Sequence, residues 1–158
     1  MFRELVRKKK QLSPEACKYI LRTEKRGVIA VIGDEGYPYA SPMNHYYNDE
    51  DGCIYFHCGK QGHRIDALRA CDKVSFCVYD KGAPSDIDWA LDVCSVVVFG
   101  RMEIIDDATQ IADISARLSR KFVQDEAYIA EEIKNHAHLT YLLRLKPEHI
   151  CGKRVHEA

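Results

Sequence analysis

The sequence of 158 residues contains no long apolar run and no excess of charge of either sign. A stretch of about 18 apolar residues is absent, which excludes a transmembrane helix. The 23 basic and 24 acidic residues nearly cancel, so no global attraction to nucleic acid or to an anionic membrane is expected. The basic segment 3–10 is not followed by an apolar stretch, so a signal peptide is not expected. Any anion-binding site must therefore be local.

The sequence also lacks the motifs of a structural metal or redox centre. Its seven cysteines are scattered and include no C-x-x-C pair, so neither a zinc knuckle nor a thioredoxin-type motif is indicated. Free thiols fit a reducing, cytoplasmic location. His136 and His138 form an H-x-H pair without a carboxylate or thiol at matching spacing, which favours a surface helix end over a metal site.

What the sequence does contain is the pattern of one mainly β domain spanning residues 1–158, of the α+β class. Apolar and β-branched runs between turn residues predict six strands, at 28–32, 37–47, 53–58, 74–79, 94–105 and 139–145. Capping residues predict helices after Ser13, from Asp106 or Asp107 to about Phe122, and from Asp125 to about Ala137. A short helix over 63–71, with Ile65 and Leu68 inward, is expected after the glycine-rich turn. Gly100 predicts a bulge or corner, and the last strand is expected to end before Pro147. Short turns favour an antiparallel barrel with flanking helices.

The segment from Phe56 to Asp66 carries the densest set of polar chemistry. A strand ends there in a turn with two glycines and is followed by a helix, an arrangement that directs backbone N–H groups to one point. His57, Lys60, His63 and Arg64 add side-chain donors to the same segment. Such a donor set suits a phosphate, although a solvated polar turn explains these residues about equally well. The segment is neither a Walker A loop nor a dinucleotide-binding fingerprint.

Four stretches make the sequence resemble the FMN-binding split barrels of the pyridoxamine 5′-phosphate oxidase-like superfamily, nearest the 5-nitroimidazole-resistance (Nim) branch. They are YPYASPMNHY (37–46), IYFHCGKQGHRID (54–66), KVSFCV (73–78) and CSVVVFGR (94–101). Their order and spacing match over roughly residues 10–152. The resemblance implies a six-stranded antiparallel split β-barrel and a homodimer with FMN at the subunit interface. The longer, arginine-bearing C-terminal region of true pyridoxamine phosphate oxidases has no counterpart here, so a vitamin B6 substrate is not expected.

The resemblance also implies roles for individual residues. Backbone groups of Pro42, Met43 and Asn44 would lie along the isoalloxazine. His57 and Cys58 would face the ribityl chain or the phosphate, and Lys60, His63 and Arg64 would bind the phosphate. Ser95 and Val96 correspond to a strand beside the flavin ring.

Two further residues, and Cys58 in a second role, are candidates of a different kind. His45 follows the segment expected along the ring and is the one guess for a catalytic group, although a structural histidine is the commoner case. Trp89 lies in a loop and either covers the flavin of a partner subunit or anchors its own core. Cys58 is the thiol most suited to function, because cationic neighbours are expected to lower its pKa, with core packing as the default.

Three functions fit these observations. The first is an FMN-dependent oxidoreductase that reduces a small electrophile such as a nitroimidazole or a quinone. The second is a non-catalytic flavin- or haem-binding module for cofactor storage or sensing, with His57 or His63 as the axial ligand. The third is a structural barrel in which the cluster around His57 has no ligand.

Overall fold

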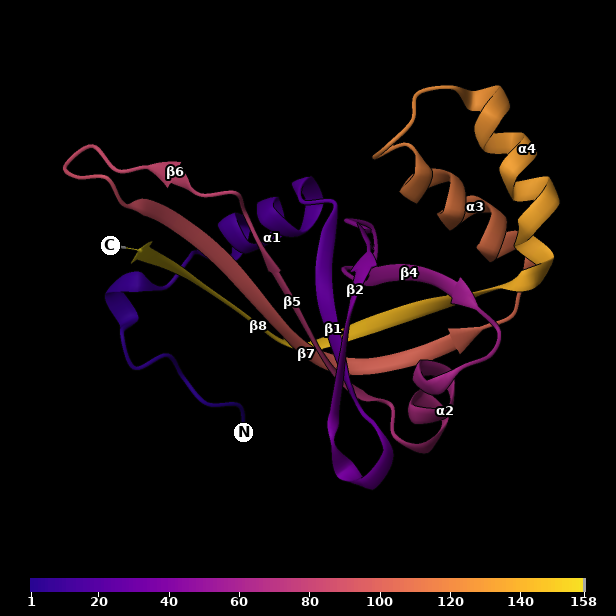
Figure 1. Ribbon diagram of the computed structural model, residues 1–158, viewed down its shortest axis with the longest axis horizontal. Helices are drawn as coiled ribbons and strands as arrows, with labels where there is room; N and C mark the ends of the chain where they lie inside the picture. Colours follow the sequence, from indigo (N-terminus) through magenta and orange to yellow (C-terminus); the bar gives the residue numbers. More distant parts are fainter. Residues whose placement is uncertain (158) are drawn as a thin grey trace.

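A computed structural model describes residues 1–157, and eight strands form a single antiparallel sheet in the order β2-β1-β5-β7-β8-β4-β3, with β6 paired to β7 (Figure 1). The strands are β1 (Arg26–Ile32), β2 (Pro38–Asn44), β3 (Tyr46–Tyr47), β4 (Ile54–Gly59), β5 (Lys73–Tyr79), β6 (Ala83–Pro84), β7 (Leu91–Ile105) and β8 (Thr140–Glu157). The predicted strand 37–47 is divided at His45 into β2 and β3, five others correspond to predicted strands, and only the two-residue β6 lies outside the predictions. The split-barrel prediction of mainly β, α+β structure is confirmed.

Three of the four α-helices begin where the sequence supplies a side-chain N-cap. They are α1 (Pro14–Thr23), α2 (His63–Ala70), α3 (Ala108–Ser119) and α4 (Glu126–His136), with single turns η1 (Lys8–Lys10), η2 (Asp34–Gly36) and η3 (Ala137–Leu139). The side chains of Ser13, Asp107 and Asp125 accept hydrogen bonds from backbone N–H groups in the first turns of α1, α3 and α4, as expected of N-caps. Helix α2 has no side-chain cap. The N–H groups of Ile65 and Asp66 donate to the Gly62 carbonyl oxygen, which leaves those of His63 and Arg64 available to another acceptor.

The predicted bulge at Gly100 is confirmed, and it explains why the last strand is longer than predicted. The β7–β8 register shifts between Phe99 and Gly100, and Gly100 pairs with Pro147. A Cβ atom at Gly100 would overlap the carbonyl oxygen of Lys146, so only glycine fits this close approach. Pro147 cannot donate to a regular ladder, but at the bulge the ladder is already irregular. Strand β8 therefore passes through Pro147 instead of ending there.

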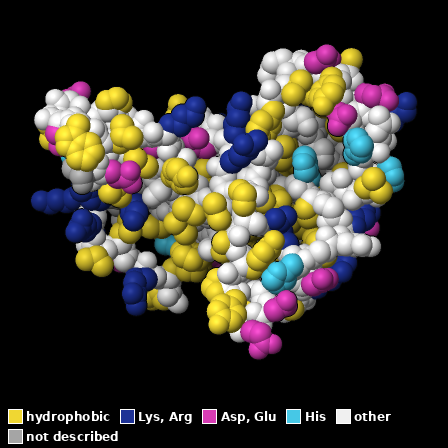
Figure 2. Space-filling model, viewed as in Figure 1, with side chains coloured by type: hydrophobic (Ala, Val, Ile, Leu, Met, Phe, Trp, Pro, Cys, Tyr) yellow, Lys and Arg dark blue, Asp and Glu magenta, His cyan; other side chains and the backbone are white. Residues whose placement is uncertain are grey.

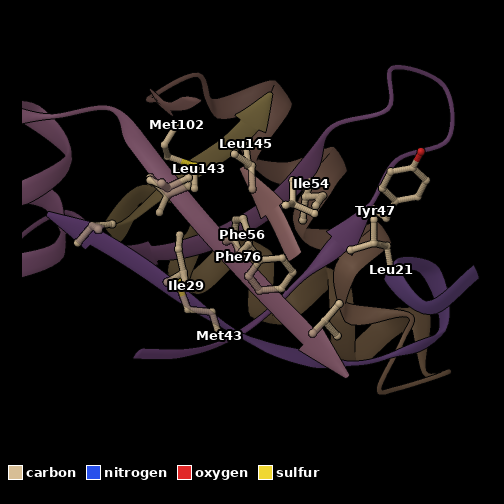
Figure 3. Packing of buried hydrophobic residues seen from close by; sticks show 14 of the residues in the cluster. Leu21, Ile29, Met43, Tyr47, Ile54, Phe56, Phe76, Met102, Leu143 and Leu145 are labelled. Carbon is tan, nitrogen blue, oxygen red and sulfur yellow. The ribbon is translucent and has the colours of Figure 1, made fainter. Parts of the chain in front are cut away.

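The main core is formed by side chains of the curled sheet and of α1, which gather between the strands (Figure 3). Phe56 of β4 and Phe76 of β5 are fully buried and meet edge to face, with ring centroids 5.0 Å apart, a geometry that aromatic pairs prefer. Leu21 of α1 joins this cluster from one end of the barrel. A second, smaller cluster, which contains Tyr55 and Leu142, packs under α3. Residues of β4 thus alternate between two cores, as its alternating pattern predicts.

The barrel is split between β2 and β4. Strand β2 stands at one end of the sheet order and β4 next to the other, and within residues 1–157 no strand pairing joins the two. Helices α3 and α4 pack beside this split, whereas β7 and β8 extend away from it as a long ribbon (Figure 1). No helix among residues 1–157 is long and apolar enough to cross a membrane.

Candidate functional site

A groove of about 490 Å³ follows the split in the barrel. Pro42, Met43 and Asn44 of β2 form one wall, and residues 57–59 of β4 form the other. Arg64, in the first turn of α2, closes one end, and Arg26 of β1 stands beside Asn44. Its volume is in the range typical of small-molecule sites. The structure therefore brings together six of the predicted cofactor-binding residues, namely Pro42, Met43, Asn44, His57, Cys58 and Arg64.

Arg64 presents a cation that the protein leaves incompletely satisfied. One guanidinium nitrogen donates to Ser41 Oγ at 2.7 Å. Its buried Nε has no hydrogen-bond partner among the described residues, and no carboxylate of residues 1–157 forms an ion pair with it. A buried, unsatisfied guanidinium donor is unfavourable on its own. Because the guanidinium lines the end of the groove without a carboxylate partner, it is available to an anionic ligand.

Arg26 is a second guanidinium in the groove, and sequence reasoning did not select it. It donates to Asn44 Oδ1 at 2.8 Å and, like Arg64, has no carboxylate partner within the described residues. The sequence does indicate its position. A hairpin with its turn at Gly33–Gly36 places Arg26 opposite Asn44, and this is the observed register. Two unpaired guanidinium groups in one groove make it electropositive in a chain whose net charge is only −1.

The protein around the groove alters the pKa values of His57 and Cys58 through desolvation. Loss of water lowers the pKa of His57, which favours the neutral imidazole. Burial raises the pKa of the Cys58 thiol, and this effect outweighs the opposing effect of Arg64. The expectation that cationic neighbours lower the pKa of Cys58 is therefore wrong. Cys58 is a protonated thiol that packs against the main core.

Lys60 and His63 lie outside the groove although they are close to Arg64 in sequence. Lys60 forms an ion pair with Asp106, and its Nζ lies 4.9 Å from the centre of the Tyr141 ring. His63 stacks against Tyr39, with ring centroids 4.3 Å apart, and its Nε2 is 3.4 Å from the backbone nitrogen of Asp34. Their predicted contact with a phosphate has no support from these positions, since their side chains already have other partners.

His45 is buried rather than positioned in the groove. It is 0% exposed, and its Nε2 lies 2.8 Å from the carbonyl oxygen of Leu21. Desolvation, together with nearby Lys121, lowers its pKa to about 3, so the ring is neutral at physiological pH. This geometry gives His45 a packing and hydrogen-bonding role between α1 and the sheet. It offers no path for contact with a ligand in the groove.

The remaining predicted cofactor-binding residues, Trp89, Ser95 and Val96, lie on β7 or in the loop before it. Val96 is fully buried in the core, whereas Ser95 faces the opposite, uncovered side of the sheet. Trp89 is 84% exposed, in the loop between β6 and β7. It does not anchor the core of its own chain. None of these three side chains lines the groove of the same chain.

No group of three or more His, Cys, Asp or Glu side chains within residues 1–157 is arranged to hold a metal ion. The lining of the groove instead consists of guanidinium, imidazole and amide groups, a thiol and backbone. That composition suits an organic anion better than a cation.

The barrel with a groove at its split defines the class of protein, and comparison with known families agrees. A family model described as pyridoxamine 5′-phosphate oxidase matches residues 13–154. The chain belongs to this pyridoxamine 5′-phosphate oxidase-like family. Comparison with curated proteins gave no match.

Solved structures with the same fold include three informative ones. A candidate 5-nitroimidazole antibiotic resistance protein from Bacteroides thetaiotaomicron has a TM-score of 0.76 at 19% identity, covering 93% of this chain and 87% of that one. An FAD-binding protein from Mesorhizobium loti has a TM-score of 0.64 at 23% identity, covering 92% and 96%. An FAD- and heme-binding protein from Mycobacterium smegmatis has a TM-score of 0.72 at 21% identity, covering 91% and 72%. At these identities the similarity establishes the fold.

Proposed function

We propose that this protein binds FMN in the groove and acts as an oxidoreductase that reduces a small electrophile such as a nitroimidazole or a quinone. The observation that carries the proposal is the pair of guanidinium groups, Arg26 and Arg64, which line one groove without a carboxylate partner in the described chain. The fold supports it, because relatives of the same architecture bear names that refer to FAD binding and to nitroimidazole resistance.

The residues present fit a flavin mononucleotide. Its terminal phosphate is a concentrated negative charge, and Arg64 presents a guanidinium without a carboxylate partner in the described chain at one end of the groove. The N-terminus of α2, which lacks a side-chain cap, adds a favourable dipole there. Toward the other end, a second cavity of about 500 Å³ shares Arg26 and Pro42 with the groove. This continuous space would hold the isoalloxazine beside the backbone of residues 42–44.

Bound flavin would supply the redox chemistry, which is hydride or electron transfer from a reduced donor to the electrophile. The chain's own residues bind and orient the cofactor. Arg26 and Asn44 would offer donors and an acceptor near the polar edge of the ring, where hydrogen bonds tune its electronics. His57, whose lowered pKa keeps it neutral, would contribute a hydrogen bond without adding charge. No residue is assigned as a general acid or base.

A homodimer is the proposed assembly, because apolar side chains stay partly exposed on the face of the sheet opposite the core, where Phe2 stacks on Phe99 and His149. In register, Pro42, Val28, Cys77, Val97 and Cys151 form one row across five strands. Figure 2 shows hydrophobic side chains gathered over the central strands on the side in view. Apolar patches of this extent are typical of association surfaces. A second copy would place its exposed Trp89 and Ser95 near the groove of its partner.

The dimer proposal predicts that Val97→Lys yields a monomer. A lysine within the apolar row would have to be desolvated on association, which is strongly unfavourable. Sedimentation velocity should give a dimer for the wild type and a monomer for this variant. Leu139→Lys, at an exposed position outside the row, should remain dimeric. A wild-type monomer at micromolar concentration would contradict the proposal.

The cofactor proposal is tested by the visible spectrum of the purified protein and by titration of the apo-protein with FMN, FAD and haem. Flavin bands and preference for FMN are expected. A Soret band would instead favour the haem-binding module, suggested by the heme-binding relative, with His57 as the one histidine that lines the groove. Absence of binding to all three would reject both. Turnover is then assayed with nitroimidazoles and quinones, using NADH or NADPH.

A further inference from the structure

A second recess lies between the α3–α4 helical pair and strand β4. It has a volume of about 340 Å³ and extends from Ser115 on α3 to Thr140 at the start of β8. Leu118 and Ile129 form its floor and are almost completely buried, while Phe122 and Ile133 form apolar walls. Apolar recesses of this size with a few polar groups at the rim are typical of small-molecule sites.

The recess opens directly onto the proposed cofactor groove. Asn44 and His57 line both spaces, and Phe122 lines both the recess and the cavity that extends the groove past Arg26. A molecule in the recess would therefore lie against whatever occupies the groove. Contact of this kind is what transfer of a hydride or electrons requires.

The charge at the mouth of the recess selects among molecules that would fit. Glu132 is the only carboxylate among the lining residues, and the lining contains no lysine or arginine. His136 lies one helical turn further on, with its Nε2 3.8 Å from the Glu132 carboxylate. An anionic molecule would be repelled by Glu132, whereas the N–H of an azole or a protonated amine would be a favourable partner. Tyr128 adds a hydroxyl at the same rim.

The helical pair that forms the recess is fixed to the barrel by the apolar packing of α3 on the second core and by a half-buried polar contact. Lys121, just after α3, donates to the carbonyl oxygens of Glu24 at 2.6 Å and His45 at 2.9 Å. These carbonyls flank the β1–β2 pair that carries Arg26 and Asn44. The recess is thereby held in a defined position relative to the groove.

We propose that this recess is the substrate site, and that it accepts an uncharged or cationic aromatic molecule of roughly one or two rings. The inference rests on the proposed flavin-dependent function and gives it a substrate class. It favours a neutral or weakly basic nitroheterocycle or a neutral quinone over a carboxylated aromatic acid.

Binding to the full chain without cofactor tests this directly. Naphthylmethylamine, naphthylmethanol and naphthoate share one ring system and differ in charge, and each is titrated while backbone amide resonances are followed by NMR. We expect shifts at α3 and α4, with the amine binding about tenfold tighter than naphthoate because of Glu132. Glu132→Gln should reduce that difference to about threefold or less. Glu131→Gln, a neighbouring exposed residue outside the recess, is the matched control and should leave the difference unchanged.

A steric variant provides an independent check. Ile133→Trp should fill the recess and weaken all three probes at least about tenfold, and its amide spectrum reports whether it is folded. Its affinity for FMN should stay within about twofold of the wild type, because the recess and the phosphate end of the groove are separate.

The outcomes separate the two proposals. Flavin binding without probe binding at α3 and α4, or with equal affinity for naphthoate and the amine, overturns the recess inference and leaves the proposed function standing. Probe binding in the recess without any flavin binding overturns the proposed function, and with it the substrate role of the recess.

Discussion

Replacement of Arg64 with alanine is expected to weaken FMN binding about 100-fold, because a charge-assisted pair of hydrogen bonds to phosphate contributes about 3 kcal/mol. Arg64 lies at the end of the groove and has a donor without a partner in the described chain. Loss of the guanidinium removes no ion pair from the fold, so the free energy of unfolding should change little. Isothermal titration of the apo-protein with FMN measures the effect.

Lys60→Ala is the informative comparison, because Lys60 and Arg64 are equally plausible phosphate ligands by sequence. In the structure Lys60 pairs with Asp106 and lies over Tyr141, so its replacement should weaken FMN binding by less than about threefold. Arg69→Ala removes an exposed arginine of the same helix, which pairs with Asp66, and should have no effect. Equal losses in the Lys60 and Arg64 variants would show that the cationic turn acts as a whole and would contradict the assignment.

The stability of the apo-protein is expected to fall by about 2 kcal/mol between pH 7 and pH 5 through His45 alone. The pKa of His45 is lowered to about 3 in the folded protein, whereas in the unfolded chain it takes the ordinary value of about 6.5. As the pH falls through this window, the unfolded state binds a proton that the folded state does not, and unfolding becomes easier. The interval lies above the pH at which most carboxylates titrate.

Urea unfolding of the wild type and of His45→Phe at both pH values isolates this effect. The phenylalanine variant loses the hydrogen bond to the Leu21 carbonyl and should be less stable at pH 7, but it should also lack the His45 contribution to the pH dependence.

His156→Asn is a control of opposite sign. Hydrogen bonds to Asp88 and Asp92 raise the pKa of His156, so its stabilisation is present at low pH and declines as the pH rises, and the variant should lose more stability on acidification. Equal slopes for the wild type and His45→Phe would contradict the buried, neutral assignment of His45.

Features of local chain geometry could be predicted from the sequence. Ser13, Asp107 and Asp125 cap the helices they were expected to cap. Gly100 marks the bulge, because close contact between strands tolerates no side chain there. Pro147 was misread as the end of a strand, because the irregular ladder that accommodates it is formed only when β7 and β8 pair.

The directions of side chains around a turn could not be predicted in the same way. Spacing places Lys60, His63 and Arg64 within five positions, yet the three side chains point to Asp106, Tyr39 and the groove, respectively. The backbone turn before α2, where Gly62 has a φ of 115°, determines these directions. The presence of a glycine in the sequence does not indicate which way the following side chains point. The pKa of Cys58 was misjudged for a related reason, because the burial that dominates it comes from residues distant in sequence.

The position of Arg26, in contrast, follows from local pairing in the β1–β2 hairpin and could have been predicted from the sequence. Pairing across the Gly33–Gly36 turn places Arg26 beside Asn44. Because Asn44 is a predicted cofactor-binding residue, Arg26 was also a candidate for the site. Motif comparison alone overlooks Arg26, because it lies outside the four stretches that resemble the family. Counting register from a predicted turn would have found it.

The long β7–β8 ribbon has a consequence for the order of folding. Ile105 and Leu142 pair next to the α3–α4 insertion, and at the far end Leu91 pairs with Glu157. The sequence separation between paired residues grows along the ribbon, so its closure entropy is least unfavourable beside the helices. Helices α3 and α4 form from local contacts and shorten the distance to be closed, which favours zipping from that end. The end that carries Trp89 would then close last and reopen first, so the segment proposed to reach a partner subunit is also the one with the lowest barrier to local unfolding.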